Sequence, residues 1–333
     1  MASVEPLPRP ALAVPPRRRG KRSSLRGWRL RDRAIFLAAW FTGVALCLIA
    51  GAIVVYLGVE GLRYLEPKLL VTSPSASVDQ SGSGGFLDPI VGTLTLAALG
   101  TLIATPIAVS AAVWVVEYGR PRWLAVAVET SIEMIAGTPD IVIAIFGLAL
   151  FQTGLFAPFS FRSSGGGVYG RSFLAAGFMV SLLAMPMTYT ATRNALAAVP
   201  RPLREASYAL GKTRIATIRR VLLPSVRAEM STGATLGMGR IIGTTAIVVL
   251  MLGASLQTSP QGNVPLLGFL RGAGTTLTGY VFANSPAGEG NAPQKAYAAA
   301  FVLMILVLVL NAAVERISRI AGRNTVQAGR LAR

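Results

Sequence analysis

The sequence contains no histidine, and that absence removes several kinds of chemistry from a chain of 333 residues. Histidine is the usual general base near neutral pH and the commonest metal ligand, so a Ser/His/Asp triad and a histidine metal site are excluded. The one cysteine, Cys47, has no partner in the chain, which excludes an internal disulfide and a thiolate metal site. The phosphate-binding pattern G-x-x-x-x-G-K-[ST] is also absent. We therefore predict no catalytic residue, no metal site and no cofactor.

Charged residues are scarce as well. They make up 14% of the chain, against 53% hydrophobic residues, and the mean hydropathy is +0.57. An ordinary soluble domain of this length carries far more charge. The composition therefore predicts a membrane protein.

Six apolar segments are long enough to cross a bilayer, which takes about 20 residues of helix. We expect the third and fifth to begin before their charge-free parts, taking in residues 124–140 and 228–240, since the run past Gly253 is rich in glycine, proline and polar residues. The predicted fold class is all-α, a polytopic membrane protein with six transmembrane helices. The charge-free parts of the six segments are residues 34–57, 90–116, 141–161, 172–192, 241–270 and 296–314.

The 32 lysines and arginines lie mostly in the N-terminal tail, in two of the connecting segments and in the C-terminal tail. By the positive-inside rule these parts are cytoplasmic, so we expect both termini in the cytoplasm. The predicted organisation is a basic tail, expected to be disordered (1–33), a transmembrane domain (34–320) and a C-terminal cytoplasmic tail (321–333). The first apolar run has the length of an anchor and lacks a clear cleavage site for a secretory signal.

The net charge of +18 favours anionic membrane lipid as a partner. Nucleic acid is the alternative partner for such a charge, but no folded domain accompanies the basic run, so we expect no nucleic-acid binding. Outside the membrane, residues 72–85 are typical of a flexible linker. A second long outer loop, residues 253–295, has apolar patches that suit a re-entrant or docking element.

A polar and mostly basic segment, REASYALGKTRIATIRRVLLPS, separates two of the apolar runs. Pro200 and Pro202 stop the preceding helix, and good helix formers then continue to Gly211, a suitable helix stop. A second short helix is expected over residues 213–222, and Pro224 should reset the chain for the next span. The pattern predicts a helix-turn-helix at the cytoplasmic surface, either as an amphipathic interfacial element or as a protein-docking surface.

Residues 200–224, called the coupling loop below, resemble the E-A-A-x-x-x-G-x9-I-x-L-P signature of ABC importer permeases. The spacing is kept throughout, with serine in place of the second alanine and valine in place of isoleucine. The resemblance implies a type I ABC importer permease fold, in which this loop docks on a cytoplasmic ATPase. The matching positions are Glu205, Ala206, Ser207, Gly211, Val221, Leu223 and Pro224.

Three further stretches are similar to the phosphate-specific permeases, PstA more than PstC: residues 88–119, 135–151 and 239–246. The resemblance implies a subunit that moves inorganic phosphate into the cytoplasm and is not itself an enzyme. Its implied partners are a PstC-like permease, PstB-like ATPase subunits and a PstS-like extracytoplasmic binding protein, and its implied place is the bacterial inner membrane. Thr244 replaces an acid of the family motif R-x-x-G-E-T, which keeps open a permease for sulfate, molybdate or an amino acid.

Arg240 is a guanidinium at membrane depth, where charge is expensive and faces the bundle interior, a cavity or a partner. One interpretation is a transient contact for a translocating oxyanion, helped by the hydroxyls of Thr244 and Thr245. The other is an ion pair with an acid of a partner subunit or with one of three acids in this chain. Glu129 and Glu133 lie one helical turn apart and could instead suggest a carboxylate pair for hydrolysis. Because no nucleophile or metal ligand accompanies them, we expect them to pack between helices. The three acids are Asp140, Glu133 and Glu129.

Overall fold

The computed structural model describes residues 30–74, 84–160, 170–253, 265–286, 288 and 292–331. Residues 1–29 of the tail predicted to be disordered lie outside these ranges, whereas residues 30–33 are helical and begin α1. Most of the predicted 72–85 linker and part of the loop 253–295 also lie outside the ranges. The chain divides into two units, residues 1–55 and 56–333. Helix α1 (Leu30–Tyr64) runs from the first unit into the second and contains a candidate span of 33 residues.

Every regular element among the described residues is a helix, as predicted. Three are long enough to span a membrane besides α1: α3 (Leu87–Val113), which continues into a π-helical turn η2 (Trp114–Tyr118), α6 (Phe173–Ala198) and α14 (Pro293–Leu331). The remaining elements are α2 (Pro67–Val71), α4 (Arg122–Gly137), α5 (Asp140–Phe151), η3 (Gly154–Phe159), α7 (Arg201–Ala209), α8 (Arg214–Thr217), η4 (Ile218–Leu222), α9 (Leu223–Ser225), α10 (Arg227–Gly243), α11 (Ala246–Leu252), α12 (Pro265–Arg271) and α13 (Leu277–Asn284).

Two further spans are broken. Helices α4 and α5 meet at 107°, and α10 and α11 meet at 62°, so the described part of the chain has four candidate spans, or six if each bent pair is one span. The first break falls at Thr138, which is extended because the proline that follows it disfavours helical backbone. These pairs confirm the expectation that the third and fifth spans begin before their charge-free parts.

The core of the second unit is built around α6. Helix α6 packs against α3 and α10, and its buried side chains are largely small. A Cβ at Gly233 on α10 would lie 2.7 Å from the Cβ of Ala191 on α6, so glycine is what lets these two helices approach. In a lipid environment such close packing supplies the attraction that apolar burial alone does not.

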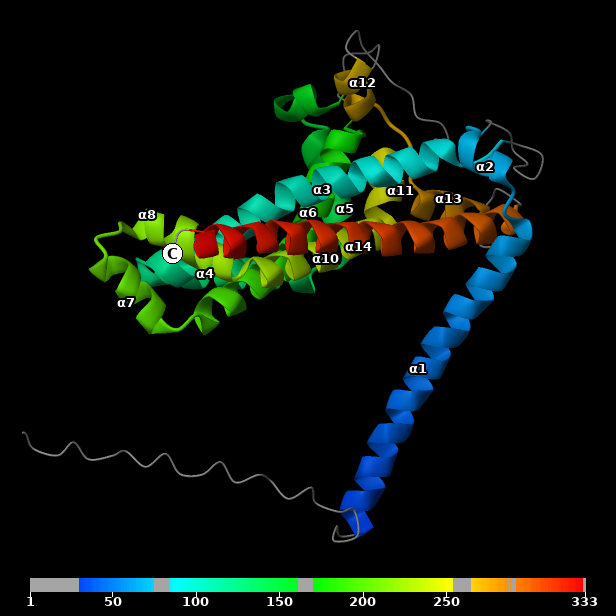
Figure 1. The fold of residues 1–333 in the computed structure, drawn as a ribbon. Helices are drawn as coiled ribbons and strands as arrows, with labels where there is room; N and C mark the ends of the chain where they lie inside the picture. The colour runs from blue at the N-terminus through cyan, green and yellow to red at the C-terminus, as the bar shows by residue number, and fades with distance from the viewer. Residues whose placement is uncertain are drawn as a thin grey trace, which may run out of the picture. The chain divides into compact units, whose positions relative to one another are not determined.

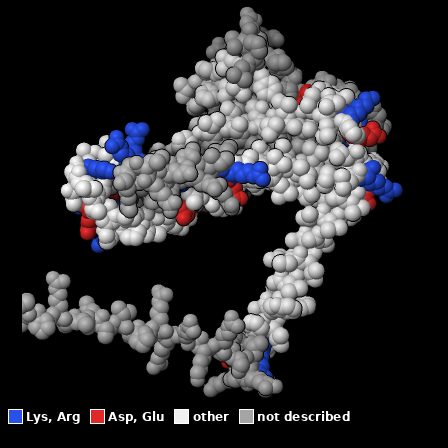
Figure 2. All heavy atoms as spheres, viewed as in Figure 1, with Lys and Arg blue, Asp and Glu red and all other residues white. Residues whose placement is uncertain are grey.

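Different short helices lie at the two ends of the second unit. Helices α7 and α8 lie at one end, and α2 and α13 lie at the opposite end of α3 (Figure 1). Lysine and arginine side chains show at both ends in Figure 2, and the surface between them is mostly uncharged, with a few charged side chains midway along the bundle. This arrangement matches a bilayer-spanning bundle, because uncharged surface is what hydrocarbon tolerates.

The structure changes one detail of the expected layout, the position of the turn before the fifth span. Pro224 lies inside α9, and the chain turns at Val226, whose φ and ψ are −110° and 10°, so the next span begins at Arg227. Proline is tolerated there because the first turn of a helix needs no N–H donor. Helix α11 ends at Leu252, next to Gly253, where the second outer loop was expected to begin, and α14 extends to Leu331.

Candidate functional site

The coupling loop forms the predicted helix-turn-helix. Helix α7 ends in a tight turn in which Gly211 has φ +73°, a left-handed conformation that a side chain disfavours. The backbone N–H of Gly211 donates to the carbonyl of Tyr208 at 2.9 Å, and that of Lys212 donates to the carbonyl of Ser207 at 3.3 Å. The turn thereby satisfies carbonyls that the end of α7 would leave without donors.

Ser207, the residue that departs from the second alanine of the motif, holds the two helices of the loop together. Its hydroxyl lies 2.9 Å from the hydroxyl of Thr217 on α8, and both side chains are buried. The Thr217 hydroxyl also lies 3.1 Å from the carbonyl of Thr213. This contact joins α7 to α8, because the buried Ser207 hydroxyl depends on Thr217 for a hydrogen bond.

Some of the motif residues are exposed to solvent, and others are partly buried against the rest of the chain. Glu205, Ala206 and Gly211 are exposed, whereas Val221, Leu223 and Pro224 are half-buried. Of the half-buried positions, Leu223 packs against a cluster formed by Leu196, Ile218, Leu222 and Val226. Around the exposed part lie four large apolar side chains with 42–78% of their surface exposed, which is the composition of a docking surface: Leu203, Tyr208, Leu210 and Ile215.

The loop also contains a buried ion pair that the sequence analysis missed. Arg204 lies 2.8 Å from Glu117 on η2, and the two side chains are 17% and 6% exposed. In the sequence, Arg204 is one of many basic residues, and Glu117 directly follows the apolar run 90–116. The available signal was an acid directly after a span-length apolar run, on the side where basic residues dominate.

The second group of predicted residues meets where the two broken spans bend. Asp140 is the first residue of α5, directly after the first bend, and Arg240 is in the last turn of α10, directly before the second. Arg240 Nη2 lies 3.0 Å from Asp140 Oδ1, and the two side chains are 34% and 33% exposed. Of the two interpretations of Arg240, the ion pair is therefore present, and its acid is Asp140.

Thr244 completes this group. It ends α10, it is buried, and its hydroxyl donates to Asp140 Oδ2 at 3.4 Å, so both carboxylate oxygens have a partner. Thr245 is half-buried and is not brought into the pair. Arg240 Nε is buried without a hydrogen-bond partner among the described residues, which leaves one donor of the guanidinium unused.

The other two acids lie elsewhere. Glu129 on α4 pairs with Arg193 of α6 at 2.7 Å, which agrees with the expected role of packing between helices. Glu133 is exposed and forms no salt bridge within the described residues. The part of the chain that the structure describes contains no group of three or more metal-ligating side chains.

Membrane-length helices, two bent helix pairs and a polar loop that exposes apolar side chains are the features of a membrane permease. The chain belongs to the family of binding-protein-dependent transport system inner membrane components, whose model matches residues 104–325. It is thus a multi-pass permease component of a binding-protein-dependent ABC importer and has no catalytic role of its own. Importers of this class combine such a permease with a second permease, an ATPase and a binding protein.

Relatives of two kinds match the chain over most of its length. It is 30% identical to the phosphate transport system permease protein PstC of Xylella fastidiosa, over 68% of this chain and 69% of that protein. It is 30% identical to the phosphate transport system permease protein PstA 1 of Mycobacterium tuberculosis, over 72% of this chain and 73% of that protein. Similarity to PstA rather than PstC therefore stays a prediction.

The fold is also that of a solved importer. A chain in the crystal structure of a bacterial alginate ABC transporter, in complex with its alginate pentasaccharide-bound periplasmic protein, superposes with a TM-score of 0.60. The match covers 88% of this chain and 96% of that chain, at 15% sequence identity. At this identity the likeness establishes the architecture.

Proposed function

We propose that this permease moves inorganic phosphate into the cytoplasm, driven by ATP hydrolysis in partner subunits. Phosphate as the transported solute is supported by the 30% identity to two relatives named as phosphate transport permeases. In this proposal a PstC-like permease completes the pathway, a PstS-like binding protein delivers phosphate, and PstB-like ATPase subunits dock on the coupling loop.

The coupling loop has the surface such docking requires. Glu205 supplies an exposed carboxylate, and Leu210 and Ile215 supply exposed apolar side chains on either side of the Gly211 turn. Nucleotide-driven movement of the ATPase subunits would then displace the loop and change which side of the membrane the pathway faces.

The pair Arg240–Asp140 gives the pathway a cation that is already neutralised at rest. An oxyanion that arrives competes with the Asp140 carboxylate for the Arg240 guanidinium, and Thr244 is the hydroxyl at hand for a further hydrogen bond. When the oxyanion leaves, the ion pair with Asp140 forms again, so the positive charge of Arg240 always has an anionic partner. Such exchange keeps affinity low enough for release.

The distribution of lysine and arginine supports an orientation with the coupling loop and both termini in the cytoplasm. Cys47 is the one native cysteine, so a Cys47→Ser chain accepts single reporter cysteines. We expect a cysteine at Ser225 to react with an impermeant maleimide only in inside-out vesicles. Reaction in right-side-out cells would reverse the orientation.

The cargo is tested by ATP-dependent uptake of radiolabelled phosphate into proteoliposomes that hold this chain, its neighbouring permease, the ATPase and the binding protein. We expect uptake that unlabelled phosphate inhibits and that sulfate, molybdate and amino acids do not. Hydrolysis of ATP without phosphate uptake would keep the importer and refute the phosphate cargo. Inhibition by sulfate or molybdate would identify another oxyanion as the cargo.

A further inference from the structure

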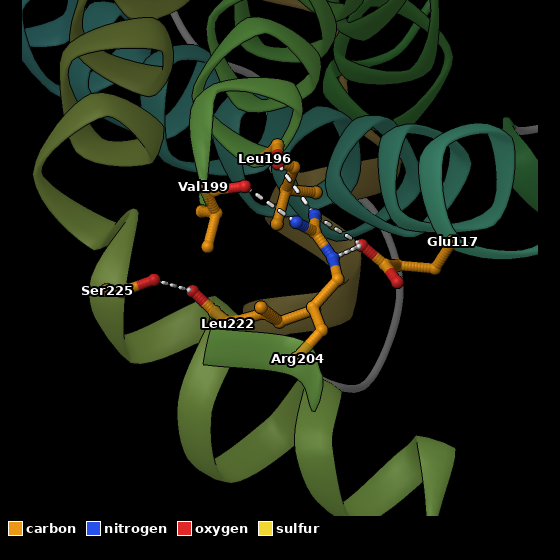
Figure 3. Close-up of polar contacts among 6 residues, drawn as sticks. All are labelled: Glu117, Leu196, Val199, Arg204, Leu222 and Ser225. Carbon is orange, nitrogen blue, oxygen red and sulfur yellow. Dashed lines mark hydrogen bonds and ion pairs between the residues drawn. The ribbon is translucent and has the colours of Figure 1, made fainter. Parts of the chain in front are cut away.

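Arg204 joins the coupling loop to the ends of two membrane helices. Its Nε and Nη2 donate to Glu117 Oε1 on η2, at 3.1 and 2.8 Å. Its Nη1 donates to the carbonyl of Val199 at 2.7 Å, and its Nη2 also donates to the carbonyl of Leu196 at 2.8 Å. Figure 3 shows the guanidinium lying between these three acceptors. One side chain of the loop therefore holds both the continuation of α3 and the end of α6.

The sequence explains why α6 needs this donor. In an α-helix the carbonyl of Leu196 accepts from the N–H four residues later, but that residue is Pro200, which has no N–H. The backbone N–H of Val199 reaches the Leu196 carbonyl at 3.3 Å, and Arg204 supplies the shorter bond. A cation is also favourable at a helix C-terminus, where the carbonyl ends of the peptide dipoles gather.

Glu117 is what fixes the guanidinium in this place. Its side chain is 6% exposed, so the carboxylate depends on Arg204 for its charge partner. It lies in a π-helical turn that ends at Gly119, with φ +49°, and such turns are frequent at functional positions. Removing one member of a buried pair leaves an uncompensated charge, which is more costly than removing an exposed pair.

A second contact ties the other helix of the loop to the same turn. The guanidinium of Arg214 on α8 lies over the ring of Tyr118, 4.5 Å from its centroid, directly beside Glu117. Because Ser207 and Thr217 join α7 to α8, the loop is held to η2 from both of its helices. Movement of the loop would therefore reach α3 and α6 directly.

We propose that Glu117 is a positioning residue for coupling: it holds Arg204 against the Leu196 and Val199 carbonyls, so that α3, α6 and the coupling loop move together. The inference rests on the proposed function, in which an ATPase docks on the loop. The ion pair resists separation as well as compression, so it transmits movement in both directions. Lysine at position 204 lacks the planar fork that reaches three acceptors and does not replace it.

The test measures amide hydrogen exchange in residues 110–119 and 193–199 of the assembled complex, with and without ATP and vanadate, together with uptake per ATP hydrolysed. In the wild type we expect exchange in both segments to respond to nucleotide. In Glu117→Gln, which keeps the shape but not the charge, we expect that response to be lost and uptake per ATP to fall about tenfold, with the ATPase still bound. Arg204→Lys should lose most of the response too.

Two variants separate this role from a general need for ion pairs. Arg193→Gln removes the more exposed pair with Glu129 and should keep the nucleotide response. The exchanged pair Glu117→Arg with Arg204→Glu should not restore it, because a carboxylate at position 204 cannot donate to the α6 carbonyls.

The outcomes also distinguish failure of the Glu117 role from failure of ATP-driven coupling through the loop. A wild-type complex without any nucleotide response would refute coupling through this loop, and the inference with it. A normal response in Glu117→Gln would overturn the positioning role alone. Loss of the bound ATPase in Glu117→Gln would assign the pair to assembly and overturn the positioning role as well. Amide exchange is measured without a transported solute, so the result remains informative even if phosphate is not the cargo.

Discussion

Arg240 and Asp140 lie 100 positions apart in the sequence and 3.0 Å apart in the structure, each beside the bend of a broken span. Neither side chain is fully buried, at 34% and 33% exposed. The pair therefore compensates the charge and leaves both groups within reach of a solute. This geometry suits a pathway better than a sealed structural ion pair would.

Replacing Asp140 by asparagine tests that interpretation. The substitution leaves Arg240 without a counter-charge, so a bound oxyanion is held more strongly and is released more slowly. We expect uptake to fall about tenfold, which corresponds to about 1.4 kcal/mol in the rate-limiting step. Uptake kinetics in proteoliposomes measure the change.

The matched control for that variant is Asp88→Asn. Asp88 is likewise an aspartate in the first turn of a helix, and it accepts a hydrogen bond from Ser73 at 2.8 Å. It should keep at least half of the wild-type uptake. Equal uptake in the two variants would remove Asp140 from the pathway.

Gly211 gives a prediction for the coupling loop. Its φ of +73° is closed to proline, and its N–H donates to Tyr208, a bond that proline also lacks. We expect Gly211→Pro to hydrolyse ATP without uptake, or to lose the ATPase.

Gly211→Ala is the milder companion. No atom lies within 4 Å of a Cβ added there, so only backbone strain of about 1–2 kcal/mol acts. It should retain partial uptake. Unchanged uptake in the proline variant is the result that contradicts a coupling role.

The hydroxyl pair of the coupling loop predicts a difference in stability between two variants. Ser207→Ala introduces the alanine of the family motif and leaves Thr217 its contact with Thr213, so it should cost about 0.5–1.5 kcal/mol. Thr217→Val leaves the Ser207 hydroxyl buried without this partner and should cost more, about 1–3 kcal/mol.

Thermal unfolding in detergent, with the double variant completing the cycle, gives the coupling energy of Ser207 and Thr217. Additive effects would show that the 2.9 Å contact does not join the two helices.

Tyr280 on α13 predicts a pH dependence of stability. Burial raises the pKa of this phenol from its ordinary 10.0 to about 12. The folded state therefore keeps its proton where the unfolded state loses it, so the contribution is complete below pH 10 and is lost as the pH rises toward 12.

Phenylalanine at this position removes the ionisation. The hydroxyl has no hydrogen-bond partner among the described residues, so Tyr280→Phe should be at least as stable as the wild type near pH 7. The difference between the two melting temperatures should grow above pH 10. A difference that stays constant with pH would show that the phenol is not protected by burial.

Much of the architecture could be predicted from the sequence, because the features that specify it are local. The apolar runs give the spans, the scarcity of charge gives the membrane, and Pro200 with Gly211 delimits α7 to within a few residues. The breaks in the third and fifth spans were less visible: the fifth charge-free run continues across its break, while the first break lies between apolar segments just before the third run. There the position of Pro139 was the one local signal for the first bend.

Contiguous residues were enough to predict a helical membrane permease and a loop with the family's motif spacing, because helix length, turn chemistry and motif spacing are local properties of the chain. Tertiary structure decided which charges meet. Arg240 had three candidate acids in the chain and pairs with Asp140, while Glu129 pairs with Arg193. Arg204 and Glu117, 87 positions apart, gave no pairing signal at all. Such pairs depend on how each helix is rotated and tilted against its neighbours. Small residues such as Gly233 and Ala191 set that rotation and tilt, because they let the helices pack closely.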